Sequence, residues 1–166
     1  EIATPERVQS NKVMGVDLGE NNIAATSTGK VIGGGKLRYD RDRFLAIRRR
    51  LQRNGSQSAK QLLKRLSGKE ARHVKQVNHQ VANAVIAEAI EHNIGVIALE
   101  KLTNIRKRIK AGKRVRARLH RWAWYQLQTF IEYKAQAIGI EVVYVNPAYS
   151  SKTCSKCGAI ATRNKH

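Results

Sequence analysis

Two kinds of hydrophobic pattern follow one another along this chain, and their order constrains the fold more than any other sequence feature. Three short apolar runs come first, at residues 13–18, 23–27 and 30–33. Thr28-Gly29 separates the last two and predicts a hairpin turn. Three short strands in a row favour an antiparallel meander. From about Asp40 onward the apolar residues recur with helical spacing instead.

The helical stretch predicts three helices before the next strand. The first begins near Asp40 and ends at Asn54-Gly55. Capping-box patterns at Ser58 and at Ser67 then predict a short helix near 59–66 and a long one near 68–92. The long helix carries one apolar stripe, formed by Val74, Val77, Val81, Val85 and Ala89.

A continuous apolar run at 96–100 is typical of a strand that is buried on both faces in a parallel arrangement. An amphipathic helix at about 118–138 and a last strand at 140–145 follow it. The order βββ-α-β-α-β predicts an α/β domain with a mixed sheet and flanking helices. The ribonuclease H-like fold has this order, although other mixed sheets share it.

The charge balance points to a polyanionic partner. The 32 Lys and Arg residues exceed the 12 Asp and Glu residues, which gives a formal net charge of +20. This excess argues against a small-molecule substrate and favours nucleic acid over a membrane surface. Because the sequence shows neither an apolar run of membrane-spanning length nor a secretory leader, we expect a cytoplasmic location and no membrane partner.

The basic residues are densest in 101–121, which holds ten Lys or Arg residues and no acid. Like charges at this density repel one another, so bound phosphates explain the segment better than a solvated loop does. For the nearby Trp122, Trp124 and Tyr125 we favour core packing over stacking on bases. The predicted nucleic-acid-binding residues are Arg106, Lys107, Arg108, Lys110, Lys113, Arg114, Arg116, Arg118 and Tyr149.

Two acids, Asp17 and Glu100, each stand at the end of an apolar strand, where an ionised carboxylate is costly unless something compensates it. If the two strands are neighbours, the carboxylates converge at one edge of the sheet, where Mg²⁺ or Mn²⁺ suits them. Two such ions about 4 Å apart would activate a water and stabilise the leaving oxygen of a phosphodiester. In the alternative, Asp17 caps a turn and Glu100 pairs with an arginine. The pair together in so basic a protein favours the metal site.

Cys154 and Cys157 have the spacing of two thiolates on one tight turn. A structural zinc site normally has four ligands, so the pair would form half of one. A redox pair is the alternative, but no thioredoxin-like context surrounds the motif. Zinc is therefore the favoured interpretation.

Three segments of this chain, 15–19, 97–102 and 145–158, resemble the C-terminal half of the OrfB/TnpB proteins, which insertion sequences encode and which are similar to type V CRISPR effectors. The resemblance implies an RNA-guided DNA endonuclease with a RuvC-like nuclease domain of ribonuclease H fold, interrupted by a zinc-binding insert. It makes Asp17 the first catalytic acid and Glu100 the second.

The resemblance also implies that the chain has three parts and that it lacks a segment which the family pattern contains. Residues 1–12 would be a tail, 13–148 an incomplete RuvC-like domain, and 149–166 the first half of a zinc-ribbon insert with Cys154 and Cys157. The family pattern continues with a second CxxC and a third catalytic Asp. After Glu100, this chain has only Glu132 and Glu141 as acids.

We therefore expect a piece of a longer protein that has little activity alone. The alternative is a non-catalytic, nucleic-acid-binding remnant of the same fold. A stand-alone junction resolvase is less favoured because the CxxC has no second pair.

Overall fold

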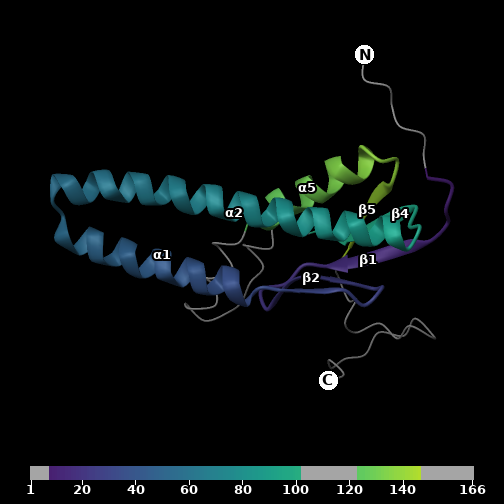
Figure 1. Cartoon of the computed structure of the whole chain (residues 1–166), viewed down its shortest axis with the longest axis horizontal. Helices are drawn as coiled ribbons and strands as arrows, with labels where there is room; N and C mark the ends of the chain where they lie inside the picture. The colour runs from purple at the N-terminus through teal and green to yellow at the C-terminus, as the bar shows by residue number, and fades with distance from the viewer. Residues whose placement is uncertain (1–7, 102–122, 147–166) are drawn as a thin grey trace, which may run out of the picture.

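One mixed β-sheet organises the part of the chain that the computed structural model describes, residues 8–101 and 123–146 (Figure 1). Its five strands are β1 (Val13–Asp17), β2 (Asn22–Thr26), β3 (Val31–Gly33), β4 (Val96–Glu100) and β5 (Glu141–Val145). The helices of these residues are α1 (Gly35–Asn54), α2 (Gln57–Glu91) and α5 (Trp124–Gln136).

The strands lie in the order β3-β2-β1-β4-β5. β1 pairs with β2 and β2 with β3 in antiparallel fashion, whereas β4 runs parallel to both β1 and β5. The expected antiparallel meander and the expected parallel setting of β4 are both confirmed. The expected burial of β4 on both faces is not found among the described residues, because only Ile97 and Leu99 are fully buried. The architecture is a mixed α/β sheet with flanking helices.

The core lies between the sheet and the second half of α2 together with α5. Met14 and Val16 of β1 lie directly opposite Ile97 and Leu99 of β4, and all four are buried. The stripe on α2 is also confirmed, because Val74, Val81, Val85 and Ala89 are buried and Val77 is partly buried in the same cluster. From α5, the buried core residues are Trp124, Leu127, Ile131 and Ala135.

The prediction of two helices separated at Ser67 is wrong, because α2 is continuous from Gln57 to Glu91. Its N-cap is Ser56, whose side chain accepts a hydrogen bond from the Ala59 N–H at 3.2 Å. A capping pattern starts a helix only where the preceding residues leave helical geometry. At Ser67 they do not, and the turns that follow it contact α1 through the Arg48–Glu70 ion pair and the Phe44–His73 ring contact.

α1 also differs from expectation at its start. It begins at Gly35, within the glycine run, rather than near Asp40. Its end agrees with the sequence, because Gly55 follows the last turn with a φ of 67°, in the left-handed region that glycine adopts without strain.

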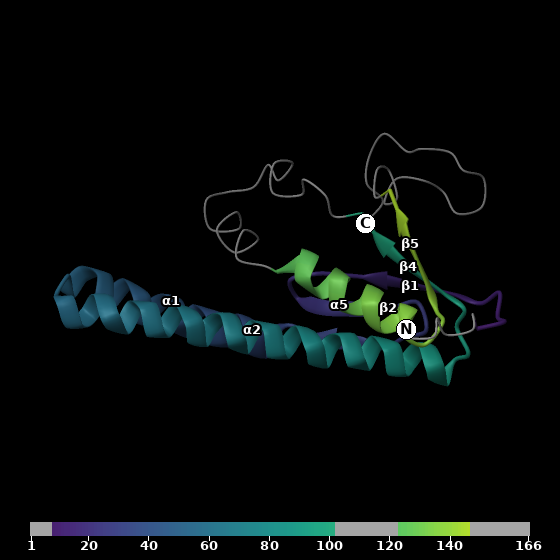
Figure 2. The same ribbon diagram turned by 90° about the horizontal axis from the view of Figure 1, so that it is seen from above.

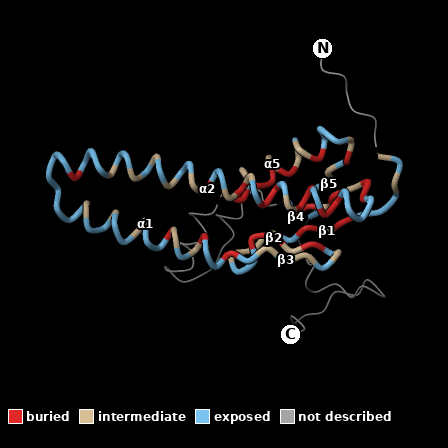
Figure 3. The backbone as a smooth tube through the Cα atoms, viewed as in Figure 1, coloured by how far each residue is buried: buried red, intermediate tan, exposed pale blue. Residues whose placement is uncertain are grey.

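The α1–α2 hairpin extends well beyond the sheet (Figures 1 and 2). With 35 residues and a rise of 1.5 Å each, α2 alone is about 52 Å long. We call residues 43–73 the arm, and the sheet with α5 and the second half of α2 the body. Ala59 is the one buried residue of the arm, and Figure 3 shows the arm exposed along nearly its whole length.

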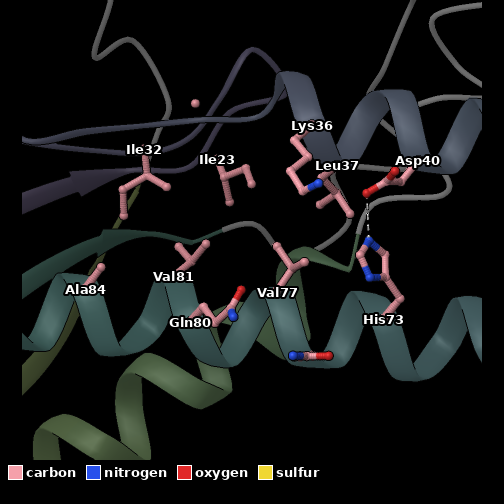
Figure 4. A pocket seen from close by; sticks show the side chains of 12 residues that line it. Ile23, Ile32, Lys36, Leu37, Asp40, His73, Val77, Gln80, Val81 and Ala84 are labelled. Atoms are coloured by element: carbon pink, nitrogen blue, oxygen red, sulfur yellow. Dashed lines mark hydrogen bonds and ion pairs between the residues drawn. The ribbon is translucent and has the colours of Figure 1, made fainter.

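A pocket of about 390 Å³ marks the junction of arm and body (Figure 4). Ile23 and Ile32 of the sheet, Leu37 of α1 and Val77 of α2 give it an apolar lining. At its arm side His73 Nε2 lies 3.1 Å from Asp40 Oδ2, so a polar contact joins α1 to α2 where they leave the sheet.

A buried carboxylate fixes the β2–β3 turn to α2. Glu88 accepts hydrogen bonds from Thr28 Oγ1 at 2.7 Å and from Lys30 Nζ at 3.1 Å, and His92 Nε2 lies 3.3 Å away. These hydrogen bonds, Thr28 first, hold the pKa of Glu88 below its usual range. The ionised form is therefore the one that stabilises this end of the sheet.

The described part of the expected tail, residues 8–12, is hydrogen-bonded to the body. The Val8 N–H donates to the Gly139 carbonyl at 3.0 Å, and Ser10 Oγ donates to the Asn93 carbonyl at 2.6 Å. A side chain at Gly95 would overlap the Ser10 carbonyl, so only glycine permits this close approach. Across 8–101 and 123–146, no helix has the length and hydropathy that crossing a membrane would require.

Candidate metal-binding site at the strand ends

The parallel pairing of β1 and β4 brings two acids together. Val16 lies opposite Leu99 in the register, so the next residues along the two strands, Asp17 and Glu100, stand side by side where both strands end. This is the adjacency that the sequence predicted if these strands were neighbours. The roles of the two residues remain predictions.

Strand alternation places the acids on the sheet face that the core does not use. Val16 and Leu99 point into the core, and successive side chains of a strand point to opposite faces. Asp17 and Glu100 therefore lie on the face opposite to α2 and α5. Asp17 is exposed and Glu100 is half-buried.

A cavity of about 400 Å³ lies beside the two carboxylates. Gly15 and Ala98, two residues before the acids on the same face, carry little or no side chain, so space remains above the sheet there. The residues that line the cavity are Gly15, Val16, Asp17, Ala25, Thr26, Ser27, Ala98, Glu100 and Val145. The site thus combines two carboxylates with room for a ligand.

Among the described residues, the environment of Glu100 disfavours its ionised form. Burial, and then the negative charge of Asp17, raise the pKa of Glu100 above its ordinary value. Two ionised carboxylates in this position repel each other unless a cation lies between them. Their oxygen atoms are ligands that Mg²⁺ and Mn²⁺ accept.

Hydrogen bonds fix the backbone on both sides of the acids. Gln128, buried on α5, donates from Nε2 to the Glu100 carbonyl at 2.7 Å. The Gly15 N–H donates to Ser27 Oγ at 3.0 Å, and the Lys101 N–H donates to the Val145 carbonyl at 2.8 Å. The carboxylates therefore project from rigid strand ends.

Sequence reasoning missed Gln128 and Ser27 as supporting residues. Gln128 had a signal, because an amide next to Leu127 on an apolar helix face needs a hydrogen-bond partner. Ser27 had none, because a serine just after a strand is ordinary turn chemistry.

A third protein ligand does not join the pair within the described residues, which contain no group of three or more His, Cys, Asp or Glu residues arranged for a metal. Glu132 accepts a hydrogen bond from Tyr144 Oη at 3.0 Å, and burial followed by this bond raises the pKa of Tyr144 to about 12. Glu141 lies opposite Val96, at the far end of β4 from Glu100. Neither acid completes the site.

Most of the other predicted site residues lie outside 8–101 and 123–146. These are the eight basic residues between 106 and 118, Tyr149, Cys154 and Cys157. Of the aromatic residues near the basic segment, Trp124 packs in the core as expected and is 6% exposed. Tyr125 does not, since it is 81% exposed.

Two family models match this chain. The OrfB_IS605 model, described as "Probable transposase", matches residues 1–106. A model described as "Cas12f1-like, TNB domain" matches residues 124–166. Together they cover most of the sequence.

Curated relatives are similar over nearly the whole chain. A TnpB-like protein of Methanocaldococcus jannaschii is 37% identical over 158 residues, which cover 88% of this chain and 56% of that protein. A CRISPR-associated endodeoxyribonuclease Cas12f1 of Syntrophomonas palmitatica is 34% identical, covering 93% and 33%. A protein of Escherichia coli named "Putative RNA-guided DNA endonuclease InsQ" is 29% identical, covering 99% of this chain and 44% of that protein. The chain thus spans between a third and just over half of these relatives.

Two solved Cas12f complexes share this fold. A Cas12f ternary complex matches with a TM-score of 0.72 and 26% identity, covering 93% of this chain and 32% of that one. A Cas12f1–sgRNA–target DNA complex matches with a TM-score of 0.73 and 24% identity, covering 96% and 41%. The fold, the matched family models and the relatives agree, and the chain belongs to the OrfB/TnpB family of insertion-sequence proteins.

Proposed function

We propose that this chain forms the nuclease domain of an RNA-guided DNA endonuclease, a RuvC-like domain of ribonuclease H fold that hydrolyses phosphodiesters with divalent metal ions. The observation that carries the proposal is the placement of Asp17 and Glu100 side by side at the ends of parallel strands, next to a cavity. The names of the relatives support DNA as the substrate.

In this proposal Asp17 and Glu100 hold Mg²⁺ or Mn²⁺ through their carboxylate oxygens. When bound, the metal ions activate a water and stabilise the leaving oxygen of the phosphodiester. The chain's own residues position the carboxylates, through the Gln128 and Ser27 hydrogen bonds, and leave room for a phosphate above Gly15 and Ala98.

DNA and a guide RNA are the proposed partners. The net charge of +20 favours polyanions, and solved structures of the same fold hold sgRNA and target DNA. We assign the phosphate contacts to the basic residues between 106 and 118, with Tyr149. Cys154 and Cys157 would provide half of a structural zinc site, and a monomer with only this half should hold zinc weakly.

We also propose that this chain alone cleaves DNA poorly. The two-metal route needs ligands for both ions, and Asp17 and Glu100 are the two carboxylates that the described residues bring together. The same observation favours the alternative function, a nucleic-acid-binding protein that does not cleave.

The test measures DNA cleavage and DNA binding with Mg²⁺ and guide RNA, both by this chain and by a longer protein that contains it. Asp17→Asn or Glu100→Gln should reduce cleavage by the longer protein by about 100-fold or more, because each removes several kcal/mol of metal-dependent stabilisation. DNA affinity should change less than about twofold, since no basic residue is lost.

Glu91→Gln is the matched control, because this exposed carboxylate stands at the end of α2 and away from the strand ends. Full cleavage by the Asp17 or Glu100 variant would exclude the metal site. Absence of cleavage by the unchanged longer protein, with binding intact, would establish the non-catalytic alternative.

A further inference from the structure

The arm carries a second concentration of positive charge, separate from residues 101–121. Residues 43–72 contain ten Lys or Arg residues and a single acid, Glu70. Glu70 is already occupied, because Arg48 Nη2 lies 2.6 Å from its Oε2. All nine remaining basic side chains of this segment are exposed.

The packing of the protein does not explain this charge. Exposed helices usually mix the two signs, since opposite charges four residues apart attract. On the arm the pairs at this spacing are alike, as in Arg49 with Arg53, and their repulsion destabilises both helices. The arm also adds almost nothing to the core, with Ala59 as its buried residue.

The basic residues lie on both flanks of the arm. Arg65, Lys69 and Arg72 are spaced four and then three residues apart, so they share one stripe of α2. Arg43 and Arg50, seven residues apart, share a stripe of α1. A groove of about 280 Å³ between the helices is lined by both Arg43 and Lys69, so these two stripes lie on the same flank.

The other flank carries Lys60 and Lys64, which the helical period places on the side of α2 opposite to the Arg65 stripe. Arg49 and Arg53 lie on the face of α1 that points away from α2, and Arg49 is the one nearer to that flank. Phosphates could therefore approach the arm from two sides. Lys60 and Arg72 are twelve positions apart, over which the helix rises about 18 Å, enough to follow several phosphates of a duplex.

We propose that the arm is a nucleic-acid-binding element that contacts the phosphate backbone along both flanks, away from the Asp17–Glu100 site. The inference rests on the proposed function only in taking a nucleic acid as the ligand. The shared chemistry is a row of phosphates, which a folded RNA or a DNA duplex can supply. A folded RNA can engage both flanks at once, whereas one straight duplex engages one.

The experiment compares three variants of the chain, each with a net charge lower by three. The first carries Arg65→Gln, Lys69→Gln and Arg72→Gln, and the second carries Arg49→Gln, Lys60→Gln and Lys64→Gln. The control carries Asn11→Asp, Lys12→Gln and Gln136→Glu, which are exposed positions outside the arm. Fluorescence anisotropy measures the affinity of each for an RNA stem-loop and for a DNA duplex over a range of salt concentrations.

We expect the arm variants to bind at least about tenfold more weakly at about 0.1 M salt, and to lower the slope of log K against log salt by about 2 to 3. The control should keep the slope of the unchanged chain, because the slope counts phosphate contacts rather than net charge. If both arm variants lose affinity for the RNA stem-loop, the ligand of the arm is RNA. If only one arm variant loses affinity, and it does so for the DNA duplex, the ligand is DNA.

Slopes that are unchanged for both arm variants and both probes would overturn the inference. Thermal melts followed by circular dichroism show whether the variants are folded. Because the substitutions remove like-charge repulsion, the variants should melt at no lower a temperature than the unchanged chain. Failure of the inference would be distinct from failure of the proposed function. Asp17→Asn tests the cleavage site and should leave both slopes unchanged.

Discussion

The two halves of α2 belong to one continuous helix, yet they form for different reasons. From Val74 to Glu91 the helix lies on the sheet, with a buried stripe and no basic residue after Lys75. From Gln57 to His73 it pairs with α1 among the described elements, buries Ala59 and carries five basic residues. The body half is thus held by burial, whereas the arm half depends on its cap, on helix propensity and on one neighbouring helix.

This difference teaches that regular secondary structure does not imply uniform stability. Elements with few buried apolar contacts open locally at a lower free energy than core elements do. The arm can therefore carry a repulsive charge that the body could not tolerate. The same property makes it suited to binding a large polyanion, which would add the contacts that the arm lacks.

The largest expected effect comes from placing the same charge in each half of α2. Val85→Asp puts a carboxylate at a position with 0% exposure in the core and should cost more than about 4 kcal/mol, enough to unfold the chain. Leu62→Asp changes a side chain that is 47% exposed on the arm and should cost less than about 1 kcal/mol. Urea denaturation of both variants measures the contrast. Equal destabilisation would mean that arm and body form one unit.

A smaller effect is expected at the charge that the body does bury. Glu88→Gln keeps the shape of the side chain but weakens the hydrogen bonds from Thr28 and Lys30, so the melting temperature should fall by several degrees. Because the pKa of Glu88 is lowered in the folded state, its contribution is present above its ordinary value of 4.5 and is lost as pH falls through the folded pKa. The difference in melting temperature between Glu88→Gln and the unchanged chain should therefore become smaller in acid.

Thermal melts at neutral pH and in acid test this behaviour. Glu91→Gln, at the exposed end of the same helix, is the control and should melt like the unchanged chain at both values. A deficit for Glu88→Gln that grows in acid would contradict the assignment.

The strands and the acids at their ends could be predicted from the sequence because both are signalled by residues close together along the chain. Each strand is a short apolar run with a clear boundary, and an acid at the end of such a run is a visible anomaly. Asp17 and Glu100 then meet because β1 and β4 are parallel neighbours. A helical crossover permits parallel pairing, but from the sequence the adjacency of these two strands was only a condition, which the structure fulfils.

The remainder depended on contacts between distant residues. Nothing near Ser67 reveals that α1 will pack across it and keep α2 continuous, so its local capping pattern was misleading. The support of Glu100 by Gln128 likewise needs α5 to return to the sheet. The basic residues of the arm are visible in the sequence. The nucleic-acid-binding prediction was nevertheless assigned to 101–121, where basic residues are denser.

The body also contains Glu100, a carboxylate whose ionised form is disfavoured by the described residues around it, and removing its charge should stabilise the protein slightly. The pKa of Glu100 is raised in the folded state by burial and by Asp17, so its ionised form costs stability as pH rises above its ordinary value of 4.5. Glu100→Gln should gain less than about 1 kcal/mol at neutral pH, because the group is partly solvated, and should gain nothing in acid.

The response to Mg²⁺ tests whether Asp17 and Glu100 form a metal site or only repel each other. A cation that binds the folded state raises the melting temperature, so Mg²⁺ should stabilise the unchanged chain and have little effect on Glu100→Gln. Thermal melts with and without Mg²⁺ provide the measurement. An equal response of both proteins would remove Glu100 from the site.

The smallest global effect is expected at the tip of the arm, where Ser56 caps α2. Ser56→Ala removes the hydrogen bond to the Ala59 N–H and should destabilise the first turn by about 0.5–2 kcal/mol. Because the arm opens locally, the melting temperature should hardly change, whereas amide exchange should accelerate at 57–60 and stay constant at 81–89.

Ser67→Ala completes the test, because Ser67 has the capping pattern but lies inside the helix. Alanine is the better helix former there, so exchange around 67 should slow slightly. If Ser67→Ala instead accelerated exchange at 68–71, a helix would begin at that serine in solution. The arm would then be two segments, and its flanking rows of charge would no longer keep the continuous spacing that α2 gives them.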